Sequence, residues 1–180
     1  MKIIDTLIND VKLLQPKVFG DERGFFMETF RDDWFRQHVA DVNFVQDNHS
    51  LSNQGILRGL HFQTKQPQGK LIRVVQGAVF DVVVDLRRSS PFFGQWCGHE
   101  LSSVNKLQMW VPAGFAHGFY VLEDNTEFVY KCTDYYAPEY EKSLLWNDSE
   151  LNIDWPIKGH ETPILSDKDK NASSFKELKF

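Results

Sequence analysis

Glycine and proline recur at short intervals through most of this chain, and this punctuation constrains its fold more than any other feature. They stand at positions 20, 24, 55, 59, 67, 69, 77, 91, 94, 98, 112, 114, 118 and 138. Between them lie short runs rich in valine, isoleucine, phenylalanine and leucine. Regular turn signals between short apolar runs are typical of a β-sandwich or β-barrel. The sequence therefore predicts an all-β fold.

Strands and two short helices are expected from the apolar runs. The strands are expected at 11–14, 25–30, 43–47, 57–63, 70–76, 78–86, 94–102, 107–111, 117–122 and 126–134. One helix is expected over 32–39, where acidic residues suit the positive end of the helix dipole, and another after Ser166. Residues 150–180 are expected to wrap the strands irregularly. Because 180 residues approach the size of one domain and no linker interrupts them, residues 1–180 are expected to form a single domain.

The most regular of these segments is 78–86, in which side chains alternate between two faces. One face is entirely apolar and consists of Phe80, Val82, Val84 and Leu86. The other face mixes valine with carboxylates and consists of Val79, Asp81, Val83 and Asp85. Such a mixed face is expected in a barrel interior that holds a polar ligand, and it is equally expected on a sheet face exposed to solvent. The strand alone does not separate these two interpretations.

Charge and composition exclude several functional classes. The formal net charge is −5, so the chain as a whole does not attract nucleic acid or an anionic membrane. No apolar run reaches the roughly 18 residues of a membrane span, and the N-terminal sequence lacks the features of a signal peptide. Cys97 and Cys132 have no metal-type spacing. We therefore expect a reduced, cytoplasmic protein with no nucleic-acid or membrane partner.

The positive charges are distributed unevenly. Residues 1–90 carry 12 basic and 11 acidic side chains, whereas residues 91–180 carry 8 and 14, and every arginine lies in the first half. Because the planar guanidinium suits phosphate, this skew is compatible with an anionic small-molecule ligand. Most of these arginines are nevertheless expected to be solvated surface residues.

Two histidines, His61 and His117, stand in patterns that indicate chemistry. His117 ends a Pro-x-Gly-x-x-His pattern at 112–117 that resembles the second metal motif of cupins, which are small double-sheet jelly rolls. The cupin metal set also needs His-x-His and a glutamate, but the earlier stretch reads His61-Phe62-Gln63. Phenylalanine cannot ligate a metal and glutamine is a poor ligand, so no metal site is expected. Both histidines are then available for acid–base chemistry.

Motifs along most of the chain together resemble one family. They are GDERGFF (20–26), FVQDNHS (44–50), LRGLHFQ (57–63), QGKL (68–71), FDV (80–82), VPAGFAHGF (111–119), EFVYK (127–131) and LWND (145–148). Their order and spacing resemble those of the dTDP-4-dehydrorhamnose 3,5-epimerase family. The resemblance implies a cupin-type jelly roll and a homodimer whose substrate is a dTDP-linked 4-keto-6-deoxyhexose. It also implies epimerisation of dTDP-4-dehydro-6-deoxy-D-glucose at C3 and C5, in dTDP-L-rhamnose biosynthesis, with no cofactor and no metal.

The resemblance also assigns catalytic roles. The C4 ketone acidifies the protons on both flanking carbons, so a base on one face of the ring and an acid on the other can invert each carbon. The family pattern makes His61 the base and Tyr130 the acid, which suits residue types that titrate near about 6.5 and about 10. The carboxylate implied to hold the imidazole is Asp169, with Asp167 close by as the alternative.

Further matched residues are implied to bind the substrate. Lys70 is implied to stabilise the enolate formed at C4, with His117 as a second donor, and Arg23 and Arg58 to bind the diphosphate. The other matched substrate contacts are Glu28, Gln46, Asp47, Asn48, Glu141 and Lys168. Taken without the family, the segment 46–48 has the composition of a turn.

The spacing of Arg58 and His61 requires a departure from an ideal strand. The two residues differ in parity, so a regular strand would point their side chains to opposite faces. Both can serve one pocket if Gly59 marks a β-bulge, or if Arg58 reaches across from a strand edge.

Three other classes of function remain compatible with the same residues. A mono-epimerase or a 3,4-ketoisomerase on this fold would move different protons of a related substrate. A cupin that binds a sugar nucleotide without catalysis would use the same polar residues for binding alone. A metal-dependent cupin oxygenase is the third alternative, which Phe62 and Gln63 disfavour.

Overall fold

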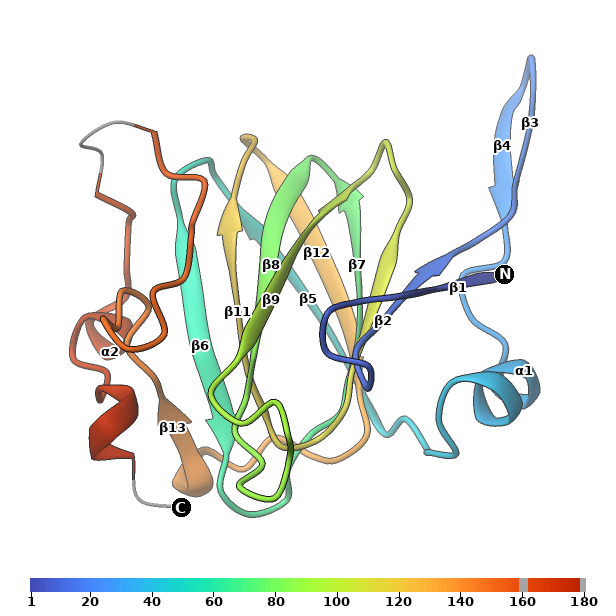
Figure 1. The fold of residues 1–180 in the computed structure, drawn as a ribbon. Helices are drawn as coiled ribbons and strands as arrows, with labels where there is room; N and C mark the ends of the chain where they lie inside the picture. The colour runs from blue at the N-terminus through green and yellow to red at the C-terminus, as the bar shows by residue number, and fades with distance from the viewer. Residues whose placement is uncertain (159–161, 179–180) are drawn as a thin grey trace.

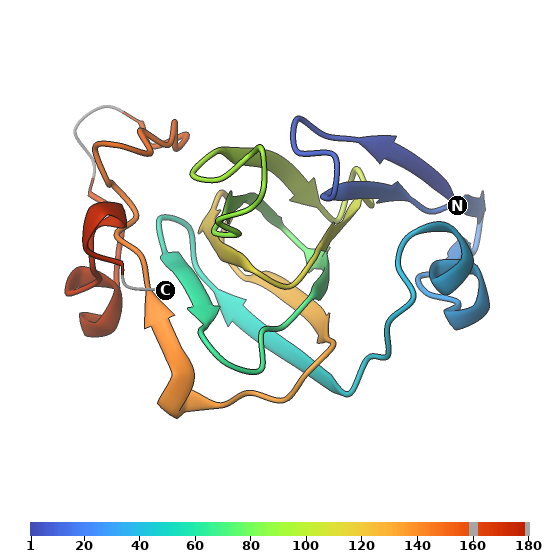
Figure 2. The same cartoon turned by 60° about the horizontal axis from the view of Figure 1, so that its bottom comes forward.

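Two antiparallel sheets face each other and enclose the interior of the protein in the computed structural model, which describes residues 1–158 and 162–178 (Figures 1 and 2). The larger sheet has the strand order β1 (Lys2–Asp5), β2 (Lys12–Gln15), β10 (Gln108–Val111), β7 (Lys70–Gln76), β12 (Thr126–Cys132) and β5 (Gln46–Ser52). The smaller sheet has the order β13 (Glu141–Ser143), β6 (Leu57–Gln63), β11 (Phe115–Val121), β8 (Ala78–Asp85) and β9 (Trp96–Ser102). The predicted all-β, double-sheet fold is confirmed.

A hairpin and a few short helices complete the structure. The hairpin consists of β3 (Val18–Asp21) and β4 (Gly24–Met27) and extends away from the two sheets (Figure 1). The helices are α1 (Asp32–His38), α2 (Asp167–Lys170) and the 3-10 helices η1 (Pro138–Tyr140) and η2 (Phe175–Glu177). Within the described ranges, no helix has the length and hydropathy needed to cross a lipid bilayer.

Strand β8 has no solvent-facing side. Val79 and Val83 belong to the core between the sheets, and Asp81 on the same face is fully buried. The opposite face packs against the C-terminal segment, where the Phe80 ring lies 6.2 Å from that of Trp155. The mixed face of 78–86 therefore lines the barrel interior, and the alternative of an exposed sheet face is wrong.

The C-terminal segment wraps the smaller sheet, as predicted. Ile164 forms a parallel bridge with Ile56, and Ser173 forms another with Leu144. Between these two anchors lies α2, whose N-cap residue is Ser166. This arrangement holds α2 beside β6.

The strand predicted at 43–47 is wrong in position, because β5 starts at Gln46 and continues to Ser52. Phe44 leaves the sheet and packs on Phe35 of α1 and Trp110 of β10, with ring centroids 5.3 and 6.1 Å away. The polar sequence of 46–52 forms a strand through its backbone pairing with β12. At the other predicted strand of this region, 25–30, pairing ends at Met27.

Strand β6 contains a bulge at Gly59, which is one of the two departures from an ideal strand that the sequence left open. His61 pairs with His117 of β11, whereas Arg58 pairs with Phe119, so β6 has one residue more than β11 between the two pairs. The extra residue resets the alternation of side chains. Arg58 and His61 consequently line the same cavity.

We expect Gly59→Ala to destabilise the protein by about 3 kcal/mol or more, because strain and overpacking act together. A methyl group at Gly59 would lie 2.4 Å from the Gly118 Cα and 2.7 Å from the His117 carbonyl oxygen, at a φ of 118°. Denaturant unfolding measures the loss. Gly55→Ala is the matched control, since Gly55 has a φ of 83° with open space around its Cβ position, and it should cost only about 1 kcal/mol. Equal losses would contradict a tight contact between β6 and β11.

Candidate active site

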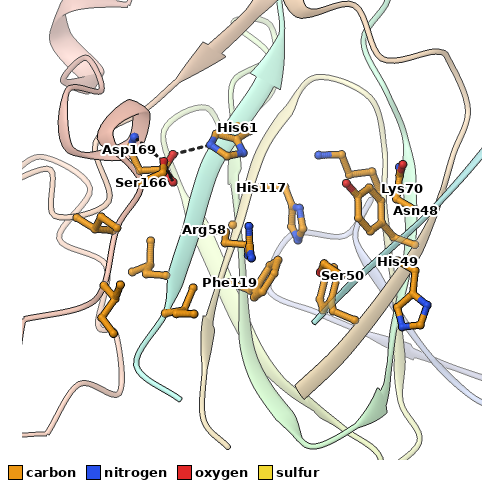
Figure 3. Close-up of a pocket in the computed structure, with 17 residues that line it drawn as sticks. Asn48, His49, Ser50, Arg58, His61, Lys70, His117, Phe119, Ser166 and Asp169 are labelled. Atoms are coloured by element: carbon orange, nitrogen blue, oxygen red, sulfur yellow. Dashed lines mark hydrogen bonds and ion pairs between the residues drawn. The ribbon is translucent and has the colours of Figure 1, made fainter. Parts of the chain in front are cut away.

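A cavity of about 560 Å³ opens between the two sheets, beside the edge strand β5 (Figure 3). Its polar lining comes from β5, β6, β7, β11, β12 and α2 and includes Asn48, Ser50, Arg58, His61, Lys70, His117, Tyr130, Ser166 and Asp169. A second cavity of about 350 Å³ shares His61, Lys70 and Tyr130 with the first. These three side chains therefore lie where the two cavities meet.

His61 is held by Asp169. Its Nε2 lies 2.6 Å from the Asp169 Oδ1, and the Asp169 side chain is only 3 % exposed. Burial alone would raise the pKa of Asp169, but the hydrogen bond and charge of His61 and the hydrogen bond from Ser166 outweigh it and lower that pKa. Asp167 is solvent-exposed and pairs with Lys170. Of the two aspartates that the sequence left open, Asp169 is the one in contact with the imidazole.

Tyr130 and Lys70 lie together on the opposite sheet. The Lys70 ammonium is 5.9 Å from the centroid of the Tyr130 ring, and the structure shows no ion pair between Lys70 and any described residue. Burial, reinforced by Cys132 and Glu141, raises the pKa of Tyr130 to about 12. Burial also lowers the pKa of Lys70, against the attraction of Cys132, Asp81 and Glu141. The site thus combines a phenol that stays protonated with a buried amine.

His117 has its own carboxylate partner, Asp81. Its Nε2 lies 2.9 Å from the Asp81 Oδ2, and both residues are buried. Burial raises the pKa of Asp81 and lowers that of His117, even though the two groups attract each other. The sequence placed Asp81 on the mixed face of 78–86, without deciding between the barrel interior and the solvent, and assigned it no role. No motif pointed to its contact with His117, because the two residues are far apart in the chain.

Arg58 and the segment 46–48 are divided between the cavity and the outer surface. The Arg58 Nε donates to the Ser52 hydroxyl at 3.0 Å, and Asn48 lines the cavity. The Gln46 side chain donates to Asn48 and accepts from the backbone of Tyr136. Since side chains alternate along β5, Asp47 faces the other way and pairs with Lys131. The structure does not bring the Asp47 side chain into this cavity.

Glu141 lies at the edge of the second cavity and links β13 to α2. Its carboxylate accepts a hydrogen bond of 2.7 Å from the Tyr136 hydroxyl and pairs with the Lys168 ammonium. Its Oε1 is 4.0 Å from the His61 Nδ1. Burial opposes ionisation of Glu141, but Lys168 and Tyr136 outweigh it and lower the pKa. Lys168 reaches the site through this ion pair.

Arg23 and Glu28 are not brought to either cavity within one chain. Arg23 is at the turn of the β3–β4 hairpin, where it pairs with Asp21 and its side chain is 86 % exposed. Glu28 follows the hairpin and is also exposed. Arg23 therefore lies on the element that extends away from the sheets, and Glu28 directly follows that element (Figure 1).

Comparisons with known proteins agree with this geometry. A dTDP-4-dehydrorhamnose 3,5-epimerase of Neisseria gonorrhoeae is 61 % identical over 94 % of the chain, although the chain spans only 51 % of that relative. The enzyme of the same name from Pseudomonas aeruginosa is 56 % identical, with 97 % of this chain and 96 % of that protein covered.

A solved structure and a family profile extend the match. The dTDP-6-deoxy-D-glucose-3,5-epimerase of Legionella pneumophila, in complex with dTDP-4-keto-L-rhamnose, superposes with a TM-score of 0.95 at 51 % identity, covering 99 % of this chain and 94 % of that one. The profile of dTDP-4-dehydrorhamnose 3,5-epimerases matches residues 5–177. The predicted jelly roll of cupin type is therefore confirmed. The chain belongs to the dTDP-4-dehydrorhamnose 3,5-epimerase family.

Proposed function

We propose that this protein is an isomerase that converts dTDP-4-dehydro-6-deoxy-D-glucose to dTDP-4-dehydro-L-rhamnose by inverting C3 and C5, in dTDP-L-rhamnose biosynthesis. The observation that carries the proposal is the placement of a carboxylate-bound imidazole and a protonated phenol on one cavity. His61 and Tyr130 come from opposite sheets, and both line the junction of the two cavities. A keto-hexose at that junction can present its two faces to a base and to an acid.

The proposed reaction moves protons only. His61 removes the proton from a carbon next to the C4 ketone, and the electron pair moves onto the C4 oxygen as an enolate. Lys70 and His117 stabilise the negative charge that develops there. Tyr130 then donates its proton to the opposite face of the carbon. Before the second carbon reacts, His61 releases its proton and Tyr130 regains one, so the net exchange is with water and no cofactor or metal takes part.

We assign the substrate contacts from the positions of the polar side chains. Arg58 binds the diphosphate at the wall of the larger cavity. Gln46, Asn48 and Glu141 contact the sugar or the nucleotide, with Asp47 and Lys168 acting from the periphery. Since Cys97 and Cys132 are both free thiols, we also propose that the protein works in the reducing cytoplasm.

The test is ¹H NMR of the reaction with dTDP-4-dehydro-6-deoxy-D-glucose in heavy water. We expect deuterium at both C3 and C5, at the same rate in the presence of a chelator. Deuterium at one carbon would indicate a mono-epimerase instead, and migration of the ketone would indicate a 3,4-ketoisomerase. Tight binding without exchange would indicate a sugar-nucleotide-binding cupin, and a rate abolished by the chelator would contradict the metal-free reaction.

We further propose a homodimer in which the β3–β4 hairpin completes the site of the other subunit. Phe19, Phe25 and Phe26 on this hairpin are each more than half exposed, which is unusual for a surface without a partner. Insertion of the hairpin would bury these rings. It would also place the partner subunit's Arg23 and the partner subunit's Glu28 beside the bound nucleotide.

Mixed dimers test this arrangement. We expect Arg23→Ala and His61→Asn each to be strongly impaired alone. Random mixing after unfolding and refolding should restore about one quarter of wild-type activity, because half of the dimers are mixed and each of these holds one intact site. If Arg23 serves its own chain, mixing restores nothing. Light scattering that shows a monomer would contradict the dimer itself.

A further inference from the structure

The Asp169 carboxylate has a second hydrogen-bond partner besides His61. We propose that Ser166 is a positioning residue, which holds Asp169 in the orientation that leaves the His61 Nδ1 free toward the substrate. This inference rests on the proposed role of His61 as the base. It adds Ser166 to the reaction and identifies Nδ1 as the atom that takes the proton.

Ser166 contacts Asp169 in two ways. Its hydroxyl donates to the Asp169 Oδ2 at 2.8 Å and accepts from the Asp169 backbone N–H at 3.2 Å. The second contact is the N-cap of α2. Ser166 therefore fixes both the backbone of Asp169 and the rotation of its carboxylate.

The carboxylate has one partner for each oxygen. Oδ1 contacts the His61 Nε2 at 2.6 Å, and Oδ2 accepts from Ser166. The terminal rotation of an aspartate is broad, so loss of the Ser166 hydroxyl would free the carboxylate to turn away from the imidazole. The Asp169 side chain is 3 % exposed, and a buried oxygen left without a partner is unfavourable.

Other contacts hold α2 in place, such as the ion pair of Lys168 with Glu141, but they do not fix the rotation of the Asp169 carboxylate. The segment is attached to its neighbours by the bridges at Ile164 and Ser173. Between them, α2 is a single turn of four residues, and Ser166 is its N-cap. The orientation of Asp169 consequently depends on Ser166.

The orientation of Asp169 decides which imidazole nitrogen is basic. An ionised carboxylate only accepts hydrogen bonds, so the Nε2 of His61 must carry the proton and donate it to Oδ1. The Nδ1 then has a free lone pair on the opposite side of the ring, toward the cavity (Figure 3). On that side the Glu141 Oε1 lies 4.0 Å from Nδ1, which is beyond hydrogen-bond distance, and the other oxygen of that carboxylate binds Tyr136 and Lys168.

The test compares Ser166→Ala and Ser166→Thr with the matched control Ser174→Ala. Ser174 caps η2 in the same C-terminal segment through Glu177 and does not contact Asp169. We expect Ser166→Ala to lower kcat about tenfold or more with KM changed less than about twofold, as for other residues that orient a reacting ligand. Ser166→Thr keeps a hydroxyl, and because Ser166 is exposed its methyl group has room, so kcat should recover. Ser174→Ala should keep wild-type kcat.

Nitrogen NMR of ¹⁵N-histidine-labelled protein, without substrate, gives a second readout that does not depend on turnover. We expect His61 to be protonated at Nε2 in the wild type and in Ser166→Thr, and to become a mixture of tautomers in Ser166→Ala. An unchanged kcat in Ser166→Ala, a failure of threonine to rescue, or an Nδ1-protonated wild type would overturn the inference. If the wild type shows no proton exchange with the sugar nucleotide, the proposed function fails, whereas the tautomer of His61 still tests Ser166.

Discussion

His61→Asn is expected to lower the rate of deuterium incorporation at both C3 and C5 by about 10³- to 10⁴-fold, the upper part of the range for a positioned general base. Asparagine is smaller than histidine and its amide ends near the Nδ1 position, but Asp169 keeps its hydrogen bond from Ser166, so the fold should survive. It has no basic lone pair to offer the sugar. Single-turnover NMR in heavy water measures the loss directly.

The control is a histidine far from the cavity. His38 lies on α1, where its ring stacks on Trp34 and its Nδ1 contacts the Trp34 carbonyl oxygen. His38→Asn should keep the wild-type exchange rate. If His61→Asn exchanged either carbon at an undiminished rate, another group would have to be the base, and the role proposed for Asp169 and Ser166 would be lost with it.

The strands around the site could be predicted from sequence because each satisfies its own local pattern. Strands β6 and β7 have the predicted bounds, since each combines apolar and polar residues between turn-forming glycine or proline positions. Strand β13 was missed because its three residues, Glu141–Ser143, include no apolar side chain and pair only with the edge of β6. Strands β1 and β3 are four residues each, too short to show a period.

The polar residues that line the cavity, and Asp169 as the partner of His61, could be predicted as a set, but the partners of Asp169 and His117 could not. Family motifs identify His61, Tyr130 and Lys70, and the structure places them at one junction of two cavities. The contacts from Ser166 to Asp169 and from Asp81 to His117 depend on side-chain orientation in the folded chain. No sequence spacing encodes such contacts. Arg23 and Glu28 lie outside both cavities of one chain, and only the dimer proposed above would bring them to a site.

Tyr130→Phe is expected to separate proton removal from inversion. The substitution keeps the aromatic ring, which packs 5.8 Å from the Phe128 ring and 5.9 Å from the Lys70 ammonium, and removes only the hydroxyl. His61 can still take a proton and return a deuteron to the same face, so the substrate should gain deuterium without changing configuration. Formation of the inverted product should fall about 10²- to 10³-fold, the loss expected for a general acid.

The pH dependence of the ratio of inversion to exchange is an independent test of Tyr130 as the acid. Because burial raises the pKa of Tyr130 to about 12, the phenol stays protonated at all pH values well below that, and its ability to donate is lost only as the pH approaches the raised value. The wild-type ratio of inversion to exchange should therefore be constant between about pH 6 and 9. Tyr140 lies in η1, where the Lys65 ammonium is 5.0 Å from the centroid of its ring, and Tyr140→Phe should leave that ratio unchanged. If Tyr130→Phe lowers the rates of exchange and inversion equally, the phenol is needed for proton removal. The assignment of a base and an acid to opposite faces of the sugar would then be wrong.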